Sequence, residues 1–496
     1  MATTVKKKVA AVLTAALLIV VVLVAFLCFF GAICYRNIYG DTGFDSVIYT
    51  LFGGLGGLQP GLLWKFILGG IVPAVLCTAV VGLVVYLPKK AAWMPSKKVF
   101  KILSLCLSLV LIGHAAFHVG LVQYVWDLTH VTDLYEKEYK DPGKVSITFP
   151  EEKRNLIYIY LESMESSFLP QAEGGAMAVD LIPELNRLAK DNLNFSHNEF
   201  VGGMVEVPGA TWTAGAMVAH SAGVPMIAPS DLADTFNGYG KDGVFLPGLN
   251  TLYNVLHDAG YYQALMVGSD ANFGGRKTYF ETHGVDKVYD LYTARADGIV
   301  PADYFVWWGM EDLHLYEYAK QKLTKMAQQD QPFAFTMLTV DTHHVGGYAC
   351  SLCGNAYEEN YDNVYSCASK QAAAFIQWIQ QQDFYENTTI IITGDHFSMD
   401  SGYFKRTAGE DYTRHGYNCF INAAAEPQGA TTNRQFTPLD MFPTTLAAMG
   451  CRIEGDQLGF GVNLFSNRIT LVEEFGYEAF CEELKQRPEY YEEHFH

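Results

Sequence analysis

The chain has 496 residues, half of them hydrophobic, which suffices for a sizeable core and predicts two to four domains. The formal net charge is −19, but residues 1–101 carry 10 Lys and Arg against 2 Asp and Glu, which leaves −27 for residues 102–496. So acidic a segment argues against nucleic-acid binding. An anionic membrane would also repel it, so attraction of a phospholipid substrate would have to come from a local metal or arginine site.

Three segments near the N-terminus contain no Asp, Glu, Lys or Arg: residues 9–35, 66–88 and 102–126. As a helix, each is long enough to cross a hydrocarbon layer of about 30 Å. We therefore predict a membrane domain of three transmembrane helices over residues 1–126. The first segment could instead be a signal peptide that begins with basic residues 6–8, but its apolar run is longer than the usual maximum of about 15 residues.

Basic residues flank these segments unevenly. Lysines precede the first helix and fill the loop between the second and third, at Lys6, Lys7, Lys8, Lys89, Lys90, Lys97, Lys98 and Lys101. The loop after the first helix has Arg36 and Lys65 against Asp41 and Asp45. Because cytoplasmic loops carry the excess of Lys and Arg, we predict a multi-pass protein of the cell membrane with a cytoplasmic N-terminus. Everything after the third helix would then be extracytoplasmic.

Residues 127–154 are mixed in polarity and contain a turn signal at Asp141-Pro-Gly143, which predicts a stalk or interfacial linker. Over residues 155–470, apolar runs of strand length at 156–161, 261–267, 332–340 and 388–393 alternate with helical stretches at 182–190, 249–259, 306–328, 372–382 and 439–449. The strands lack polar alternation, so we expect an α/β domain with a mainly parallel sheet flanked by helices. Functional residues would then lie beyond the carboxyl ends of the strands. The acidic tail, residues 471–496, predicts a solvated terminal helix.

Six of the ten cysteines lie in the part predicted to be extracytoplasmic, where disulfides can persist: Cys350, Cys353, Cys367, Cys419, Cys451 and Cys481. The spacing Cys350-Ser-Leu-Cys353 suits half a zinc site or a redox pair, but no second Cys-x-x-Cys follows. We expect a loop disulfide instead, either within this pair or to Cys367.

Polar residues follow several of the predicted strands, as in Glu162-Ser163, Asp341-Thr-His-His344 and Gly394-Asp-His396. A parallel sheet would bring Glu162, Asp395 and His396 to one edge. Thr213 lies in Trp212-Thr-Ala-Gly-Ala-Met217, which is typical of a loop that enters a helix, where the helix dipole favours a phosphate. The plain alternatives are an N-cap threonine, a capping Asp-His pair and a salt-bridged glutamate.

Together these motifs resemble the phosphoglycerol transferases and lipoteichoic acid synthases of the alkaline phosphatase/sulfatase superfamily. The resemblance covers about residues 150–465 and includes Gly459-Phe-Gly-Val-Asn-Leu-Phe465. It implies an alkaline-phosphatase-like domain in which Glu162, Thr213, Asp395 and His396 hold one divalent metal ion. Two carboxylates, an imidazole and a hydroxyl suit Mn²⁺, which we expect first, with Mg²⁺ or Zn²⁺ as alternatives.

The resemblance also implies a reaction. Thr213 would attack a phosphatidylglycerol-type lipid, form a phospho-threonine diester and release diacylglycerol, after which a hydroxyl of a surface glycan or polymer would take the glycerol-phosphate group. Thr211 competes for the role of nucleophile. His343 would contact the phosphate or protonate the leaving group, with its neighbour His344 as the alternative.

Two further residues would bind substrate. Arg276 resembles the family arginine that grips a phosphate, but the tryptophan that lipoteichoic acid synthases have two places before it is Gly274 here. His415, next to Arg414, could face the site or lie on a surface loop.

Other functions remain in view. A phosphoethanolamine transferase would keep the same metal ligands and threonine, and a phosphodiesterase or sulfatase-type hydrolase belongs to the same superfamily. A sulfatase needs Cys or Ser in a (C/S)-x-P-x-R sequence, and none surrounds Thr213. The intact set of Glu162, Thr213, Asp395 and His396 argues against a tethered binding or sensor protein without catalysis.

Overall fold

The computed structural model describes residues 2–40, 43–44, 46–48, 60–86, 96–227, 243–409 and 412–496. The chain forms two compact units, one made of Met1–Phe44 with Leu58–Trp126 and the other containing Asp127–His496. Four residues used to predict orientation, Asp41, Asp45, Lys89 and Lys90, lie outside the described residues.

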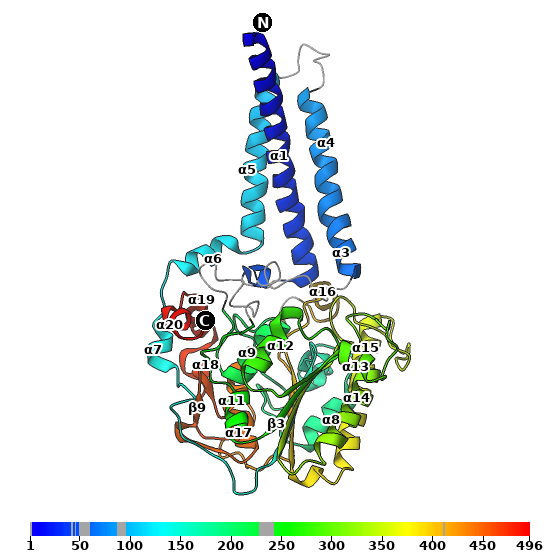
Figure 1. Ribbon diagram of the computed structural model, residues 1–496, viewed down its shortest axis with the longest axis vertical. Coiled ribbons are helices and arrows are strands. Elements are labelled where there is room, and N and C mark those ends of the chain that lie inside the picture. Colours follow the sequence, from blue (N-terminus) through cyan, green and yellow to red (C-terminus); the bar gives the residue numbers. More distant parts are fainter. Residues whose placement is uncertain are drawn as a thin grey trace. The chain divides into compact units, whose positions relative to one another are not determined.

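The first unit confirms the three predicted N-terminal apolar helices. They are α1 (Ala2–Tyr39), α4 (Val72–Tyr86) and α5 (Lys97–His118) (Figure 1). Directly before α4, the chain forms the short helix α3 (Pro60–Phe66) and the π-helical turn η1 (Ile67–Ile71). Stretches of all three, Val12–Tyr39, Gly61–Val85 and Lys97–His118, are long and apolar enough to cross a membrane. The π-turn ends two residues before Pro73. Proline has no N–H to donate to the carbonyl four residues earlier, as a regular α-helix requires.

The third apolar run was predicted as one segment over residues 102–126, and the structure divides it. Helix α5 ends at His118, and a separate helix, α6, covers Leu121–Leu128. Gly120 between them has φ +78°, a left-handed conformation that glycine adopts without steric cost. This glycine ends the long helix before the apolar sequence itself ends.

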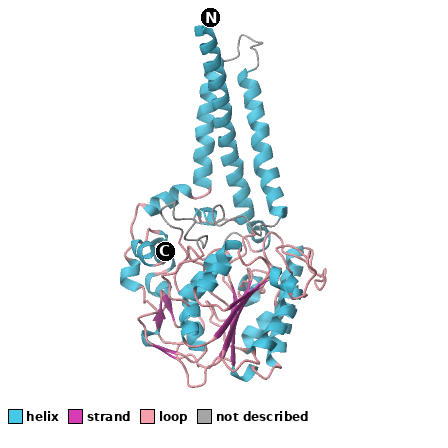
Figure 2. Ribbon diagram, in the orientation of Figure 1, coloured by secondary structure: helices cyan, strands magenta, loops and turns pink. Residues whose placement is uncertain are grey.

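The second unit is built on a six-stranded sheet, drawn as magenta arrows in Figure 2, with the strand order β4-β3-β5-β2-β6-β7. The strands are β2 (Asn155–Leu161), β3 (Tyr262–Val267), β4 (Lys287–Tyr289), β5 (Phe333–Leu338), β6 (Thr388–Gly394) and β7 (Asn418–Ile421). All neighbours pair in parallel except β6 and β7. The predicted α/β fold with a mainly parallel sheet is therefore confirmed, and the predicted strands correspond to the four central ones.

Helices cover both faces of this sheet. Figure 1 shows α8 (Pro183–Asp191), α14 (Asp312–Met326) and α15 (Asn360–Gln380) on one side, and α9 (Thr213–Ala222), α11 (Leu252–Asp258) and α17 (Met441–Ala448) on the other. Helix α15 begins 12 residues before the predicted start because buried Tyr361 and Tyr365 continue its core-facing side. Helix α14 begins six residues late, after a turn in which Trp307 has φ +53°.

Shorter elements complete the unit. They are the helices α7 (Leu134–Glu138), α12 (Arg276–Thr282), α13 (Leu291–Ala296) and α16 (Ser401–Thr407), the pairs β1 (Ile147–Thr148) with β8 (Arg452–Ile453) and β9 (Gln457–Leu458) with β10 (Gly461–Val462), and the 3-10 turns η2 (Ser166–Phe168), η3 (Gln171–Glu173), η4 (Phe273–Gly275), η5 (Tyr385–Asn387), η6 (Pro438–Asp440) and η7 (Glu454–Asp456).

The acidic tail differs from the single solvated helix that we predicted. It forms three short helices, α18 (Leu471–Phe475), α19 (Tyr477–Lys485) and α20 (Glu489–His494). Phe480 and Tyr491 are buried, and the ring of Tyr491 packs 5.8 Å from that of Tyr135. The apolar and aromatic side chains between the glutamates therefore anchor the tail to the segment after α6.

Candidate active site

The central strands bring the predicted carboxylates together. Strands β2 and β6 pair in register from Asn155 with Thr388 to Leu161 with Gly394. Glu162 and Asp395 are the next residues on each strand, so they emerge side by side at the carboxyl edge of the sheet. His396 follows Asp395, and all three side chains are buried.

Thr213 reaches this edge from the start of α9. Trp212 is the N-cap residue and makes no side-chain capping bond, so Thr213 is the first helical residue rather than a cap. Its hydroxyl lies 3.4 Å from Glu162 Oε2 and 3.2 Å from His396 Nε2. The structure therefore places the Thr213 hydroxyl against the cluster, with the free N–H groups of the helix N-terminus beside it.

Glu162, Asp395 and His396 each direct one ligand atom to a common point, with these atoms within 4.8 Å of one another. His396 Nε2 lies 3.4 Å from Glu162 Oε1 and 3.4 Å from Asp395 Oδ2. The other ring nitrogen, Nδ1, donates to the Phe397 carbonyl at 2.8 Å, so the Nε2 lone pair faces the cluster when the ring is neutral. Such a donor set fits a divalent metal ion.

The hydrogen bonds of the Asp395 carboxylate support this fit, because one of its two oxygens accepts none from the described part of the chain. Asp395 Oδ1 accepts hydrogen bonds from the backbone N–H groups of Ser163 and His396, both at 2.8 Å. Asp395 Oδ2 is buried, and within the described residues it has no hydrogen-bond partner. A buried carboxylate oxygen without a donor is costly, and a metal ion would satisfy it.

The pKa values of the three buried residues also indicate that a positive charge in the cluster is favourable. Burial, and then the charge of Glu162, raise the pKa of Asp395 to about 7. Burial would lower the pKa of His396, but Asp395 and Glu162 outweigh it and raise that pKa to about 10. Burial would likewise raise the pKa of Glu162, but His343 and His396 lower it well below its usual range. Two buried carboxylates are thus balanced by a proton on His396, whose place a divalent ion could take.

His343 lies beside the cluster. Its position is close enough to Glu162 and His396 for each to affect its pKa, which burial lowers overall. Nδ1 bonds to the His344 carbonyl at 2.8 Å, which leaves Nε2 as a proton acceptor in the neutral ring. The rings of Trp308 and His344 lie on it with centroid distances of 4.4 Å each.

Arg276 begins α12 and is buried. Its guanidinium donates to Ser269 Oγ and to the carbonyls of Asp270 and Phe273, each at 2.9 Å, and so stabilises its own loop. The positive charge of Arg276 also contributes to lowering the pKa of His343. Gly274 has φ +69°, a conformation in which a tryptophan would be strained. The aromatic surface beside the histidine comes instead from Trp308, a residue that the sequence motifs did not reveal because it lies in a different loop.

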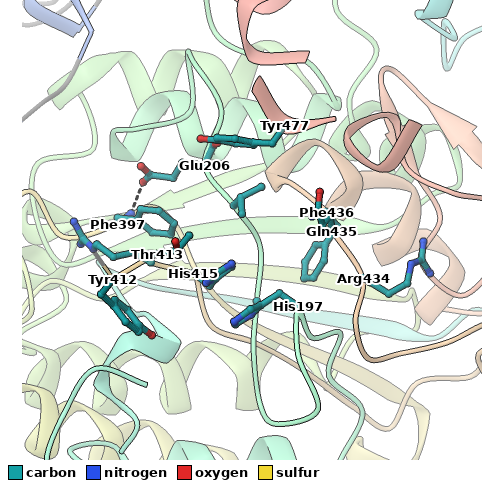
Figure 3. A pocket seen from close by; sticks show the side chains of 13 residues that line it. His197, Glu206, Phe397, Tyr412, Thr413, His415, Arg434, Gln435, Phe436 and Tyr477 are labelled. Atoms are coloured by element: carbon teal, nitrogen blue, oxygen red, sulfur yellow. Dashed lines mark hydrogen bonds between the residues drawn. The ribbon is translucent and has the colours of Figure 1, made fainter. Parts of the chain in front are cut away.

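His415 lines a cavity of about 490 Å³ whose lining does not include Glu162, Asp395 or His396 (Figure 3). Its ring stacks on His197 at a centroid distance of 3.4 Å. Phe397, which directly follows His396, also lines this cavity and donates its N–H to Glu206. Burial raises the pKa of Glu206 to about 7. No motif indicated Glu206, since only the fold brings its loop to Phe397.

Arg414 does not lie on a free surface loop. It forms an ion pair with buried Glu165 and donates to the Ser398 carbonyl at 2.8 Å. These contacts tie the segment after Glu162 to the segment after His396 and so hold the two sides of the cluster in position.

Comparison with known proteins agrees with this architecture. A model of the family described as Sulfatase matches residues 154–451, which is more than half of the chain. The chain belongs to the sulfatase family. The predicted family relationship is thereby confirmed.

Curated relatives of this sulfatase-family chain include phosphoglycerol transferase I of Salmonella choleraesuis (strain SC-B67), 29% identical over 453 residues, which cover 86% of this chain and 54% of that relative. Phosphoglycerol transferase I of Escherichia coli (strain 55989 / EAEC) is 28% identical over 443 residues, with the same coverage. The chain thus spans about half the length of these relatives. Among solved structures, the lipoteichoic acid synthase LtaP from Listeria monocytogenes shares the fold, with a TM-score of 0.50 and 19% identity over 65% of this chain and 79% of that one.

Proposed function

We propose that this protein is a membrane-bound, metal-dependent phosphoglycerol transferase. It moves a glycerol-phosphate group from a phosphatidylglycerol-type lipid to a surface glycan or polymer, through a phospho-threonine at Thr213. The observation that carries the proposal is the Thr213 hydroxyl, held 3.2 Å from His396 and 3.4 Å from Glu162 at a helix N-terminus. The two curated relatives named phosphoglycerol transferase I support the choice of the transferred group.

Glu162, Asp395, His396 and Thr213 would hold the metal ion, for which the oxygen-rich set favours Mn²⁺, with Mg²⁺ or Zn²⁺ as alternatives. When bound, such an ion stabilises a threonine alkoxide and neutralises a phosphate oxygen. Asp395 Oδ2 is the ligand atom whose contribution is best defined, since it accepts no hydrogen bond from the described residues and has only the His396 ring, at 3.4 Å, beside it.

Thr213, its hydroxyl proton already lost to solvent, would form a bond from Oγ1 to phosphorus while the bond from phosphorus to the diacylglycerol oxygen breaks, and the second step returns Thr213 to the same deprotonated form. His343, charged while a bound phosphate anion raises its pKa, would give its Nε2 proton to the departing alcohol. Its Nδ1 bond to His344 holds the ring in the required orientation. The neutral Nε2 then takes the proton of the acceptor hydroxyl, whose oxygen attacks phosphorus and frees Thr213.

Other residues would shape the pocket for the substrate. Arg276 supplies positive charge near His343, and Trp308 offers an apolar wall for the glycerol carbons. The ring of His344 supports His343 by stacking on it. His415 would act at a distance from the phosphate, in the cavity that begins at Phe397.

The donor decides between this activity and that of a phosphoethanolamine transferase. Full-length protein with Mn²⁺ should release diacylglycerol from phosphatidylglycerol and not from phosphatidylethanolamine in matched vesicles. Asp395→Asn serves as the inactive control because it replaces a proposed metal-binding carboxylate by a neutral amide. Release from phosphatidylethanolamine alone would replace the proposed donor, and release of free glycerol phosphate without any transfer to added glycan would indicate a hydrolase.

A further inference from the structure

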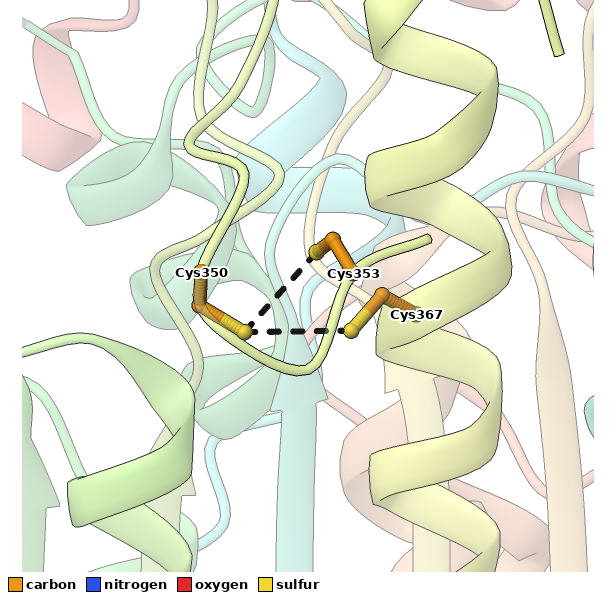
Figure 4. Close-up of side chains that lie close together, drawn as sticks. All are labelled: Cys350, Cys353 and Cys367. Carbon is orange, nitrogen blue, oxygen red and sulfur yellow. Dashed lines mark hydrogen bonds between the residues drawn. The ribbon is translucent and has the colours of Figure 1, made fainter. Parts of the chain in front are cut away.

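Three cysteines of the second unit lie together, although only two are close in sequence. Cys350 and Cys353 are in the loop that follows the His343-His344 segment, and Cys367 is in the middle of α15 (Figure 4). Cys350 Sγ is 3.8 Å from the sulfur atoms of both Cys353 and Cys367. All three sulfurs lie within 4.8 Å of one another.

We propose that Cys350, Cys353 and Cys367 bind a thiophilic divalent cation of the Zn²⁺ class through three thiolates, with a fourth position open to water or an outside ligand. This site is separate from the oxygen-rich active site, and the proposal does not depend on the reaction assigned there.

The spacing of the sulfur atoms suits such an ion. Bonds from zinc to sulfur of about 2.3 Å at tetrahedral angles separate the sulfurs by ~3.8 Å. Two edges of the triangle have this length, and the third is no longer than 4.8 Å. Thiol groups in simple contact can have the same separation, so a second observation is needed to distinguish the two cases.

That observation is a side-chain amide directed at two of the sulfur atoms. The side-chain amide of Gln371, one turn after Cys367, lies 3.4 Å from the Cys367 sulfur and 3.8 Å from that of Cys350. Hydrogen bonds of this kind stabilise thiolates, which are the form that binds metals.

A disulfide would use two of the sulfurs and leave the third without a covalent partner, whereas a metal ion can bind all three. Cys350 and Cys367 are buried, whereas Ser351 and Leu352 are exposed, so the loop side of the cluster faces solvent and can admit the ion.

Cobalt distinguishes this site from the active site, because thiolate ligands to Co²⁺ give an intense charge-transfer band that oxygen and nitrogen ligands do not. Reduced, chelator-treated full-length protein should develop this band on titration with Co²⁺, and Zn²⁺ should bleach it. Cys367→Ser should lose most of the band. Cys451→Ser, which removes a buried thiol outside the cluster, and Asp395→Asn, which alters the active site, should both retain it.

The wild-type titration remains decisive if the Cys367→Ser variant does not fold. A wild-type protein without the thiolate band would overturn the proposal. So would peptide mapping of freshly isolated, unreduced protein that finds Cys350 in a disulfide with Cys353 or Cys367, which is the pairing expected from sequence.

Discussion

Asp395 illustrates how a single buried residue links stability to metal binding. One of its oxygens is satisfied by two backbone N–H groups, and the other has no hydrogen-bond partner among the described residues. We predict that Mn²⁺ raises the melting temperature of the wild-type protein and that Asp395→Asn loses most of this increase, because ion binding stabilises only the folded state. Turnover should fall by at least about 10²-fold, since an oxyanion-stabilising contact contributes roughly this much.

The matched control is Asp440→Asn. Asp440 is also buried, and burial raises its pKa to about 7, but its carboxylate accepts hydrogen bonds from the N–H groups of Thr437 and Val462 and is not part of the cluster. This variant should change the melting temperature equally with and without Mn²⁺. An equal response of Asp395→Asn and the wild type to Mn²⁺, measured by thermal unfolding, would remove Asp395 from the proposed ligand set.

Among the elements, the four central strands could be predicted because buried parallel strands form continuous apolar runs. Strands β4 and β7, of three and four residues, were missed because such short segments carry too little pattern. The start of α15 was missed because its buried side mixes tyrosines and polar residues with the aliphatic ones, which weakens the apolar pattern. The tail was misjudged for a related reason, since its many glutamates concealed the apolar positions that pack.

The arrangement of the strands also explains which residues of the site could be predicted from the sequence. Glu162 and Asp395-His396 end strands that pair in register, so their meeting follows from the sheet. Trp308 and Glu206 reach their positions through loops whose tertiary placement no local pattern encodes. For these two, only the folded chain reveals the contact.

At the scale of the whole molecule, the proposed reaction requires the domain that contains Thr213 to lie outside the cytoplasm. This orientation depends on flanking lysines, of which Lys89 and Lys90 lie outside the described residues. We predict that a reporter active only in the cytoplasm gives no signal when fused after Ser466, whereas the same reporter fused after Lys90 is active. Activity after Ser466 would reverse the assigned orientation.

The central claim is that Thr213 is the covalent nucleophile, and peptide mass spectrometry of the enzyme after brief reaction with phosphatidylglycerol tests it most directly. We expect a glycerol-phosphate adduct on the peptide that contains Thr213, and on Thr213 itself after fragmentation. Thr213→Ala should lose the adduct and at least about 10³-fold in rate, equivalent to roughly 4 kcal/mol of activation free energy, while Thr211→Ala keeps both. An adduct that maps to Thr211, or a Thr213→Ala variant that keeps about a tenth of wild-type turnover, would contradict the account.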